Sequence, residues 1–320
     1  MSLILALDVG GTTTAAGAVT AEGEVVRERQ MPTHAGGPGT ALATIEHLLE
    51  TVRADVGGQP IAAVGVGVPA IVHAAEGIVG DEAHNVPELA GFPLARRLSE
   101  RFGLPVFIDN DVNALALAQW RFDLGRGARS LVVLAPGTGF GSGIIVDGHL
   151  VRGAHGFGAE LGHVPVKFDG PSCWCGGRGC LALYASGRGI AEAAQALASG
   201  VDGAALRAAA GGDPSRIDAP LVFRLAAEGD PVASGVIDEA CRSLGAMLGT
   251  VVNGLNPDVI VVTGGVAGAF ALLEKRVLAA AAEFAFRRAL PTTKIAIVPG
   301  DKQSSMRGAA ALALYELEHR

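Results

Sequence analysis

The sequence predicts an α/β protein built from two similar halves. Segments typical of buried strands alternate with amphipathic helices along the chain, which indicates an α/β fold. One plan of strand, glycine-rich turn and strand occurs twice, which indicates an internal duplication. A chain of 320 residues with 49% hydrophobic content is also long enough for two sizeable cores.

The repeated plan opens each half. In the first copy a strand is expected at 3–7, a turn at 8–14 and a strand at 15–20, and in the second copy a strand at 130–135, a turn at 136–142 and a strand at 143–146. When Gly11-Thr12 is aligned with Gly137-Thr138, Gly17 falls on Gly143. Two such halves facing one another would place both Gly-Thr turns on opposite sides of one cleft.

The other elements follow from hydrophobic periodicity. Strands are expected at 61–69, 106–108 and 258–263, and helices at 94–102, 112–122, 189–198, 221–227, 231–255 and 304–318. The last helix is expected to pack back onto the first domain. We therefore expect a small N-terminal lobe of residues 1–112 plus 304–320, and a large C-terminal lobe of residues 113–303.

Charge and composition argue against several classes of partner. A net charge of -7 without basic runs argues against nucleic acid, because neutralising phosphates needs clustered Lys and Arg. The first residues lack a charged n-region and reach Asp8 too early for a signal peptide. The longest uncharged stretch, 130–146, contains Pro136 and several glycines and predicts strands rather than a membrane span. A cytoplasmic location is expected, because a thiol-rich metal site stays intact under reducing conditions.

Three of the four cysteines and one histidine fall within residues 163–180, as His163, Cys173, Cys175 and Cys180. Thiolate sulfur and imidazole nitrogen suit tetrahedral Zn²⁺, and a set of four protein ligands is typical of structural zinc. The alternatives are buried thiols or a disulfide. Cys173 and Cys175 are too close to pair comfortably, and three clustered cysteines leave one over, so the pattern favours zinc.

Two glycine-rich turns are candidates for phosphate binding. No lysine in the chain follows a glycine, so a Walker-type nucleotide site is excluded. Asp8 precedes a Gly-Gly-Thr-Thr turn, and its carboxylate suits Mg²⁺ held through water beside a nucleotide's outer phosphates. A plain β-hairpin turn is the alternative. The recurrence of the pattern at Gly137–Gly141 favours phosphate binding, because successive N–H groups in such turns form anion-binding concavities.

A polar run, Asp109-Asn110-Asp111-Val112-Asn113, lies where a predicted strand ends and a helix begins. Side chains at such a point enter a crevice at the carboxyl edge of the sheet. The helix N-terminus favours an ionised Asp111 that can accept a proton, and Asn110 can donate to and accept from a hydroxyl. Helix capping by one of the acids is the alternative. Glu160 is a second candidate for binding a polyol, its alternative being a solvated acid.

These motifs together resemble the ROK family of bacterial sugar kinases and sugar-responsive repressors, over nearly the whole chain. The matching segments are Asp8-Val-Gly-Gly-Thr-Thr13, Gly65-Val-Gly-Val-Pro69, Asn85-Val-Pro87, Phe92-Pro-Leu94, Asn110-Asp111-Val-Asn113, Gly137-Thr-Gly-Phe-Gly-Ser-Gly143, Gly158-Ala-Glu-Leu-Gly-His163, Cys173-x-Cys-Gly-x-x-Gly-Cys180, Gly264-Gly265 and Gly308-Ala-Ala-Ala311. The resemblance implies a duplicated actin-like (ribonuclease H-like) ATPase fold, with two lobes around a central cleft.

The resemblance also implies a function, ATP-dependent phosphorylation of a hexose at its 6-hydroxyl, with Asp111 as general base and a glucokinase-like activity. Implied cofactors are ATP, Mg²⁺ and structural Zn²⁺ held by His163, Cys173, Cys175 and Cys180. Implied sugar contacts are Pro69, Asn85, Asn110, Asp111, Glu160 and His163. Implied ATP and phosphate contacts are Asp8, Gly10, Gly11, Thr12, Thr13, Gly137, Thr138, Gly139, Gly264 and Gly265. A homodimer or higher homo-oligomer is implied as well.

One departure bears on the substrate. In the kinases of this family the last cysteine is followed by one residue and then a glutamate that touches the sugar near its anomeric end, but here the residue is Ala182. We therefore expect either a preference for a sugar modified at C1 or C2 or a poor glucokinase. The alternative class is a non-catalytic sugar sensor or regulator. Repressors of the family carry an N-terminal helix-turn-helix, whereas this sequence starts on the strand 3–7, so DNA binding is not expected.

Overall fold

The computed structural model describes residues 2–319, and these form two compact units. The first unit contains Met1–Leu131, Gly143–Ala159 and Asp301–Arg320, and the second contains Val132–Ser142 and Glu160–Gly300. The lobe boundaries expected from the sequence stay a prediction. A continuous helix, α3 (Asp111–Phe122), runs through residue 112 and lies in the first unit.

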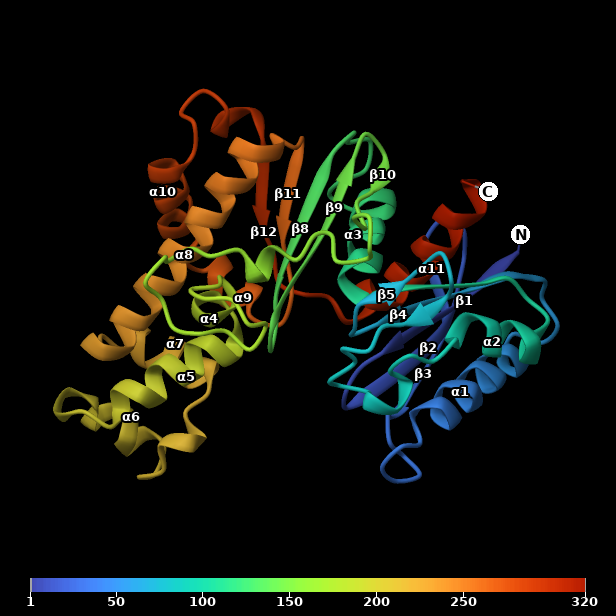
Figure 1. Ribbon diagram of the computed structural model, residues 1–320, viewed down its shortest axis with the longest axis horizontal. Helices are drawn as coiled ribbons and strands as arrows, with labels where there is room; N and C mark the ends of the chain where they lie inside the picture. The colour runs from blue at the N-terminus through green and yellow to red at the C-terminus, as the bar shows by residue number, and fades with distance from the viewer. Residues whose placement is uncertain (1, 320) are drawn as a thin grey trace. The chain divides into compact units, whose positions relative to one another are not determined.

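A five-stranded sheet forms the centre of the first unit (Figure 1). Its order is β3-β2-β1-β4-β7, with β1 at Leu3–Val9, β2 at Thr13–Val19, β3 at Val25–Pro32, β4 at Ile61–Val68 and β7 at Val106–Asn110. Strands β1, β4 and β7 are parallel, whereas β2 and β3 run antiparallel to their neighbours. A separate hairpin joins β5 (Val72–His73) and β6 (Ile78–Val79).

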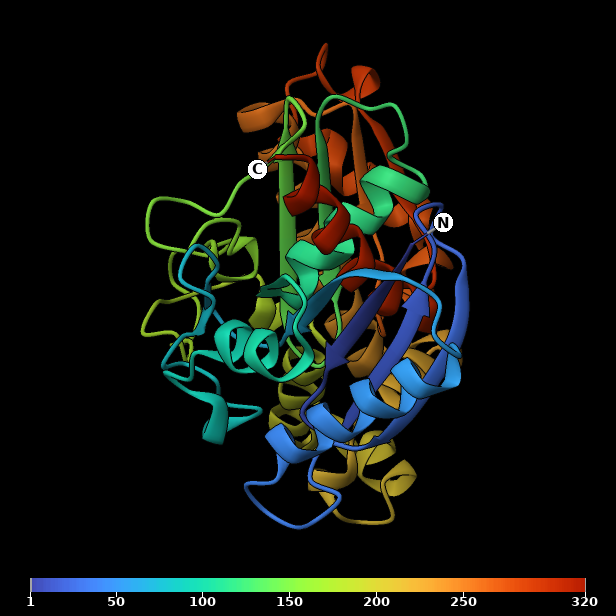
Figure 2. The same cartoon turned by 90° about the vertical axis from the view of Figure 1, so that its right-hand side faces the viewer.

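Helices cover both faces of this sheet (Figures 1 and 2). Helices α1 (Ala41–Asp55) and α2 (Leu94–Phe102) lie on one face, where Leu5, Leu7 and other alternate strand residues form a core with Ile45, Leu49 and Leu98. Fully burying such a side chain stabilises the fold by about 1.5–3 kcal/mol. Helices α3 and α11 (Lys302–Glu318) lie on the other face and pack against each other.

Glycines in the strands allow α11 to approach the sheet closely. A Cβ atom at residue 65 in β4 would overlap the carbonyl oxygen of Ala309, and a Cβ at residue 17 in β2 would lie 2.9 Å from the sulfur of Met306. Because neither position has room for a side chain, the C-terminal helix rests almost directly on the strand backbones. The segment farthest along the sequence thus completes the first unit.

The second sheet repeats the topology of the first. Its order is β10-β9-β8-β11-β12, with β8 at Leu131–Pro136, β9 at Phe140–Val146, β10 at His149–Leu150, β11 at Val259–Val262 and β12 at Lys294–Ile297. An antiparallel pair again joins one edge, and β11 and β12 are parallel. The same order, position by position, is the structural form of the duplication predicted from the two Gly-Thr turns.

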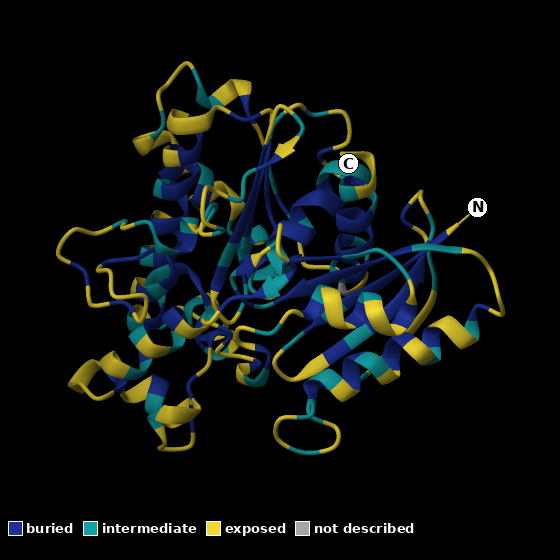
Figure 3. Ribbon diagram, turned by 45° about the vertical axis from the view of Figure 1, so that its right-hand side comes forward, coloured by how far each residue is buried: buried dark blue, intermediate teal, exposed yellow. Residues whose placement is uncertain are grey.

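The second unit is rich in helices. They are α4 (Ala182–Ala185), α5 (Gly187–Ala198), α6 (Ala204–Ala209), α7 (Ala219–Ala227), α8 (Pro231–Leu255), α9 (Ala267–Ala271) and α10 (Glu274–Phe284). The long helix α8 packs against α4, α5, α7 and α10 and is buried over much of its length (Figure 3). Its ends carry local signals: Asp230 caps the first turn before Pro231, and Asn256 ends the helix in the left-handed conformation.

Short 3₁₀ turns connect several of these elements, at Pro87–Leu89, Leu161–His163, Val201–Gly203, Pro214–Arg216 and Leu290–Thr292. Within residues 2–319, no helix combines the length and the apolar character that crossing a bilayer requires.

The structure differs from the sequence-based elements in several places. The turn expected at 8–14 is shorter, because Asp8 pairs with Ala15 as part of the β1–β2 ladder and β2 begins at Thr13. No element is predicted between residues 20 and 61, where the structure has β3 and α1, or between 265 and 304, where it has α9, α10 and β12. Strand β3 is an edge strand with mostly exposed side chains, so it lacks the apolar run by which the central strands are recognised.

Candidate active site and metal centre

Two acidic residues lie in one row across three parallel strands of the first unit. Asp8 of β1 is in register with Gly67 of β4, and Gly67 is in register with Asp109 of β7. Adjacent strands lie about 4.8 Å apart, so this row brings the ends of β1 and β7 within about 10 Å of each other. Asn110 and Asp111 follow directly at the end of β7 and the start of α3, at the edge where α/β sheets bind ligands.

Asp8 is held in an environment that disfavours its charge. Burial raises its pKa from 3.8 to about 6, and a hydrogen bond with the side chain of Ser305 on α11 offsets part of that rise. The turn that follows is tight: the N–H of Gly10 donates to the carbonyl oxygen of Thr13 at 3.1 Å, and a Cβ at residue 10 would meet that oxygen at 2.5 Å. Gly11, Thr12 and Thr13 are exposed.

Asn110 caps helix α3. Its Oδ1 accepts hydrogen bonds from the backbone N–H groups of Val112 at 2.9 Å and Asn113 at 3.2 Å. Its Nδ2 donates to the carbonyl oxygen of Ala70 at 3.3 Å. The capping alternative considered for this run therefore applies, but to the asparagine rather than to an acid. Asp111 begins the helix, is partly exposed, and accepts a 2.9 Å hydrogen bond from Val112.

Two further expected sugar contacts lie near this cap and the first Gly-Thr turn. Pro69 follows β4 and precedes Ala70, whose carbonyl oxygen receives the Asn110 hydrogen bond. Asn85 is exposed and lies against the glycine-rich turn, since a Cβ at residue 11 would be 3.1 Å from the Asn85 Cβ. The first unit thus gathers its candidate phosphate turn and its candidate sugar residues at one edge of the sheet.

The second Gly-Thr turn lies at the start of helix α5. The N–H of Gly137 donates to the carbonyl oxygen of Gly139 at 2.9 Å, closing the turn, and the N–H groups of Gly187 and Arg188 donate to Gly137 and Thr138 at 2.8 and 3.1 Å. A Cβ at residue 264 would lie 2.8 Å from the carbonyl oxygen of Pro136, directly before the turn. The two glycine pairs expected to hold a nucleotide in this half are therefore neighbours.

The segment Glu160–His163 packs beside that turn. The N–H of Leu161 donates to Oγ of Ser142 at 2.9 Å, and Gly162 lies so close to the carbonyl oxygen of Phe140 that no Cβ would fit. Glu160 is exposed, and His163 ends the 3₁₀ turn with a partly exposed ring. The strand that follows the Gly-Thr-Gly turn thus positions the segment expected to hold sugar hydroxyls.

His163, Cys173, Cys175 and Cys180 form one cluster, with their ligand atoms all within 4.8 Å of one another. Nδ1 of His163 lies 3.6 Å from Sγ of Cys173, and Sγ of Cys175 lies 3.7 Å from Sγ of Cys180. Zn–S bonds of about 2.3 Å in a tetrahedron separate two sulfur atoms by about 3.8 Å. The donor set and its spacing fit zinc, and all four cysteines are free rather than paired in disulfides.

Burial and the closeness of the thiols alter their protonation. Burial, together with hydrogen bonds and charge from the neighbouring thiols, raises the pKa of Cys180 to about 12. A bound divalent cation reverses this effect and holds the thiols as thiolates. Gly176 and Gly179 take positive φ values of 87° and 64°, which let the backbone wrap around the sulfur atoms. The rings of Trp174 and His163 pack edge-on, with their centroids 4.6 Å apart.

The structure adds two residues that the sequence analysis did not identify. Ser305 hydrogen-bonds Asp8 from a helix 297 positions away, and Arg152 forms an ion pair with the buried Asp109 at 2.6 Å. Both partnerships join distant parts of the chain, so no local pattern reports them.

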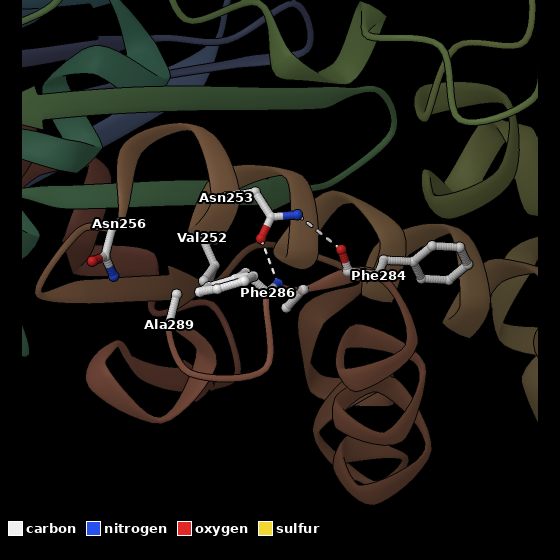
Figure 4. A pocket seen from close by; sticks show the side chains of 7 residues that line it. Val252, Asn253, Asn256, Phe284, Phe286 and Ala289 are labelled. Carbon is white, nitrogen blue, oxygen red and sulfur yellow. Dashed lines mark hydrogen bonds between the residues drawn. The ribbon is translucent and has the colours of Figure 1, made fainter.

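A surface pocket with a volume of about 530 Å³ lies elsewhere on the second unit (Figure 4). It is lined by Val252, Asn253, Asn256, Phe284, Ala285, Phe286 and Ala289. Asn256 precedes β11 and Gly264 follows it, so the pocket is at the end of this strand opposite the glycine turns. Both polar groups of Asn253 already bond the backbone, to Phe284 and Phe286. We do not place the reaction there.

The chain is similar to known proteins over nearly its whole length. The model of the ROK family matches residues 4–316. The chain belongs to the ROK family. It is 35% identical over 267 residues to a glucokinase of Streptomyces coelicolor, covering 83% of this chain and 82% of that one. It is 30% identical over 309 residues to a glucokinase of Thermotoga maritima, covering 97% and 96%. An N-acetylmannosamine kinase of Shigella flexneri is 31% identical over 276 residues, covering 85% and 87%.

Two crystal structures have the same fold. A ROK hexokinase from Thermus thermophilus matches 99% of this chain and 100% of its own, with 30% identity and a TM-score of 0.82. A ROK family glucokinase from Streptomyces griseus, in complex with glucose and AMPPNP, matches 97% and 99% with 30% identity and a TM-score of 0.75. The predicted family and the predicted duplicated actin-like fold are confirmed.

Proposed function

We propose that this ROK protein is a sugar kinase that transfers the γ-phosphoryl group of ATP to the 6-hydroxyl of a hexose. The observation that carries the proposal is the placement of Asp111. It begins helix α3 directly after the cap residue Asn110, at the carboxyl ends of the parallel strands β1, β4 and β7, and in the same unit as a glycine-rich turn. The glucokinase relatives support the assignment to the sugar kinases.

In the proposed reaction Asp111 acts as the general base. Its carboxylate takes the proton of the 6-hydroxyl as that oxygen attacks the γ-phosphorus, while the bond to the β,γ-bridging oxygen breaks and ADP leaves. A base positioned in this way contributes about 10²–10⁴-fold to the rate. The N-terminus of α3 supports the role, because the partial positive charge at the start of a helix stabilises a negative charge at the first helical residue.

The glycine turns are proposed to hold the nucleotide. The turns Gly10–Thr13 and Gly137–Gly139 suit the phosphates, because Gly10 and Gly137 close them by hydrogen bonds and the residues that follow each are exposed. Gly264 with Gly265 is proposed to contact the adenosine. Asp8 is proposed to hold Mg²⁺ through water. When bound, Mg²⁺ neutralises charge that develops on the transferred phosphoryl group. The start of helix α5 at the second turn adds a positive partial charge there.

Glu160 and His163 are proposed to bind sugar hydroxyls, as Pro69, Asn85 and Asn110 are in the first unit. The Cys₃His cluster would hold zinc with all four ligands supplied by the protein, which suits a structural role. Its contribution is then indirect: by fixing the loop 163–180, it fixes His163 and the turn that carries Glu160.

Ala182 is proposed to shift the sugar preference. It begins α4 and is 7% exposed, so a methyl group stands where the kinases of the family have a carboxylate. A hydrogen bond between a hydroxyl and a carboxylate contributes about 1.5–3 kcal/mol, which corresponds to a roughly ten- to hundredfold weaker grip on a free reducing hexose. We therefore expect Ala182→Glu to raise kcat/KM for glucose relative to N-acyl hexoses and glycosides, measured with both substrate classes. Unchanged glucose turnover in that variant would remove this explanation.

The proposed function is tested by an ADP-release assay with MgATP and a panel of glucose, mannose, N-acetylglucosamine, N-acetylmannosamine, fructose, allose and cellobiose. Asp111→Asn is the control, because it keeps the shape of the base but removes its basicity. Turnover that disappears in this variant supports the kinase. Sugar binding by calorimetry without turnover on any sugar would instead support the alternative, a non-catalytic sensor.

A further inference from the structure

We propose that Arg152 is a positioning residue for the reaction: through the buried Asp109 it holds the segment that carries Asp111. This role depends on the function proposed above, because Asp111 is the general base of that reaction. Arg152 itself is not among the residues proposed to contact the substrates. The role is inferred from an ion-pair network within the first unit, whose members come from β7, from the segment after β10, and from α11.

Arg152 contacts two carboxylates from different elements. Its Nε donates to Oδ2 of Asp109 at 2.6 Å, and its Nη2 donates to Oε1 of Glu316 on α11 at 2.6 Å. The guanidinium also lies over the ring of Tyr315, 6.0 Å from its centroid. A guanidinium is planar and presents its donors in a fixed fork, so two such contacts fix its orientation.

Asp109 passes this orientation on to the start of helix α3. Its side chain is only 3% exposed. While Oδ2 faces Arg152, Oδ1 accepts from the backbone N–H of Asn110 at 2.7 Å and from Nδ2 of Asn113 at 2.9 Å. Asn110 and Asn113 flank Asp111 and Val112, so both sides of the proposed base are tied to one carboxylate.

Arg152 anchors a second segment through its backbone. Its carbonyl oxygen accepts a hydrogen bond from the N–H of Gly158 at 2.8 Å, which closes the loop 153–158 directly before Ala159 and Glu160. One residue therefore constrains both the strand end that leads to Asp111 and the loop that leads to Glu160.

The charges explain why the pair matters more for position than for stability. Moving two charges out of water costs about as much as their attraction returns, so a buried ion pair contributes little net stability. If Arg152 is removed, however, Oδ2 of the buried Asp109 loses its partner, and we expect the carboxylate to shift toward water. Such a movement would displace Asn110 and Asp111 with it, and a displacement of about 1 Å costs roughly 10²-fold in rate.

The test compares steady-state kinetics of Arg152→Met, the double variant Asp109→Asn with Arg152→Met, and the matched control Arg121→Met. The control breaks a different ion pair of α11, the one between Arg121 of α3 and Glu318, 2.6 Å apart. The side chains of Arg121 and Arg152 are both 25% exposed. The control leaves Asp109 untouched. Each variant is assayed with the sugar that the wild type turns over, and its thermal unfolding is recorded to confirm that it is folded at the assay temperature.

We expect Arg152→Met to lower kcat about 100-fold with KM for the sugar within about threefold of the wild type, because binding survives while the base is misplaced. The double variant should regain at least about tenfold, since the amide introduced at position 109 can still accept from Asn110 and Asn113 without a buried charge. Arg121→Met should stay within about threefold of the wild type. If Arg152→Met does not fold, Arg152→Lys replaces it; a single ammonium cannot keep both contacts, and kcat should fall about tenfold.

Full kcat in Arg152→Met or Arg152→Lys would overturn the inference and leave the kinase function standing. An equal loss in Arg121→Met, or no recovery in the double variant, would also overturn it, because a general loss of packing would then be enough. A wild type without turnover on any sugar would fail the proposed function itself, and with it the role of Arg152.

Discussion

Asp8 gives a prediction in which stability and function oppose each other. Burial raises the pKa of this carboxyl from 3.8 to about 6, so ionised Asp8 is disfavoured in the folded protein relative to the unfolded chain. A difference of about two pKa units corresponds to roughly 3 kcal/mol of unfolding free energy. For a raised carboxyl pKa, the cost is absent below pH 3.8, grows as the pH rises from 3.8 to 6, and is fully present above 6.

Asp8→Asn should therefore stabilise the protein by roughly 3 kcal/mol at pH 8 when neither nucleotide nor Mg²⁺ is present. The gain should shrink below pH 6 and vanish near pH 4. At the same time MgATP-dependent turnover should be lost, because the proposed Mg²⁺ site loses its charge. The assay is urea-induced unfolding of both proteins between pH 4 and 8, compared at each pH. Asp202→Asn, at an exposed aspartate, is the control.

A stability difference between Asp8→Asn and the wild type that does not change with pH would refute this reasoning. Such a result would mean that the substitution acts through packing or through the hydrogen bond with Ser305 rather than through the buried charge. A destabilised variant at pH 8 would refute it equally, since it would show that the ionised carboxylate is well compensated in the folded protein.

Two further predictions concern the Cys₃His cluster and the segment directly before it. Purified protein should contain one zinc per chain, and Cys173→Ser should bind none. A strong chelator should release the zinc and lower the melting temperature. It should also change the fluorescence emission of Trp174, because the ring of Trp174 contacts His163 edge-on. Metal-free protein with unchanged unfolding would contradict a structural zinc. Ala159 has a φ of 64°, a conformation that costs a residue with a Cβ about 1–2 kcal/mol. Ala159→Gly should therefore stabilise the protein by roughly 0.5–1 kcal/mol in thermal unfolding, whereas Ala196→Gly, on the exposed side of α5, should destabilise it by about 1 kcal/mol. Equal effects at both sites would show that residue 159 is not strained.

Much of the architecture can be predicted from local sequence signals. The bounds predicted for the helices 94–102 and 231–255 are those of α2 and α8. These helices end where residues adopt the left-handed conformation, at Gly103 and Asn256, and α8 begins at an Asp-Pro cap. The duplication can also be predicted from the sequence, because each Gly-Thr turn is formed by consecutive residues. Similarly, the clustering of three cysteines with His163 indicates zinc because the ligands of a small metal knuckle are close in sequence.

The contacts of two aspartates, Asp8 and Asp109, depend on the tertiary structure. The sequence around Asp8 does not show whether its carboxyl group is solvated or buried. In the folded chain burial raises its pKa, and the packing of α11 onto β1 and β4 places Ser305 beside it. In the sequence Asp109 is likewise one acid in a polar run. The structure shows that its two carboxylate oxygens accept hydrogen bonds from Arg152 and Asn113. Local patterns report interactions over a few residues, whereas burial and ion pairing depend on which distant segments fold against each other. For that reason the kind of protein and its candidate residues follow from sequence patterns, whereas the burial of Asp8 and the ion pair of Asp109 follow from the folding of distant segments against each other.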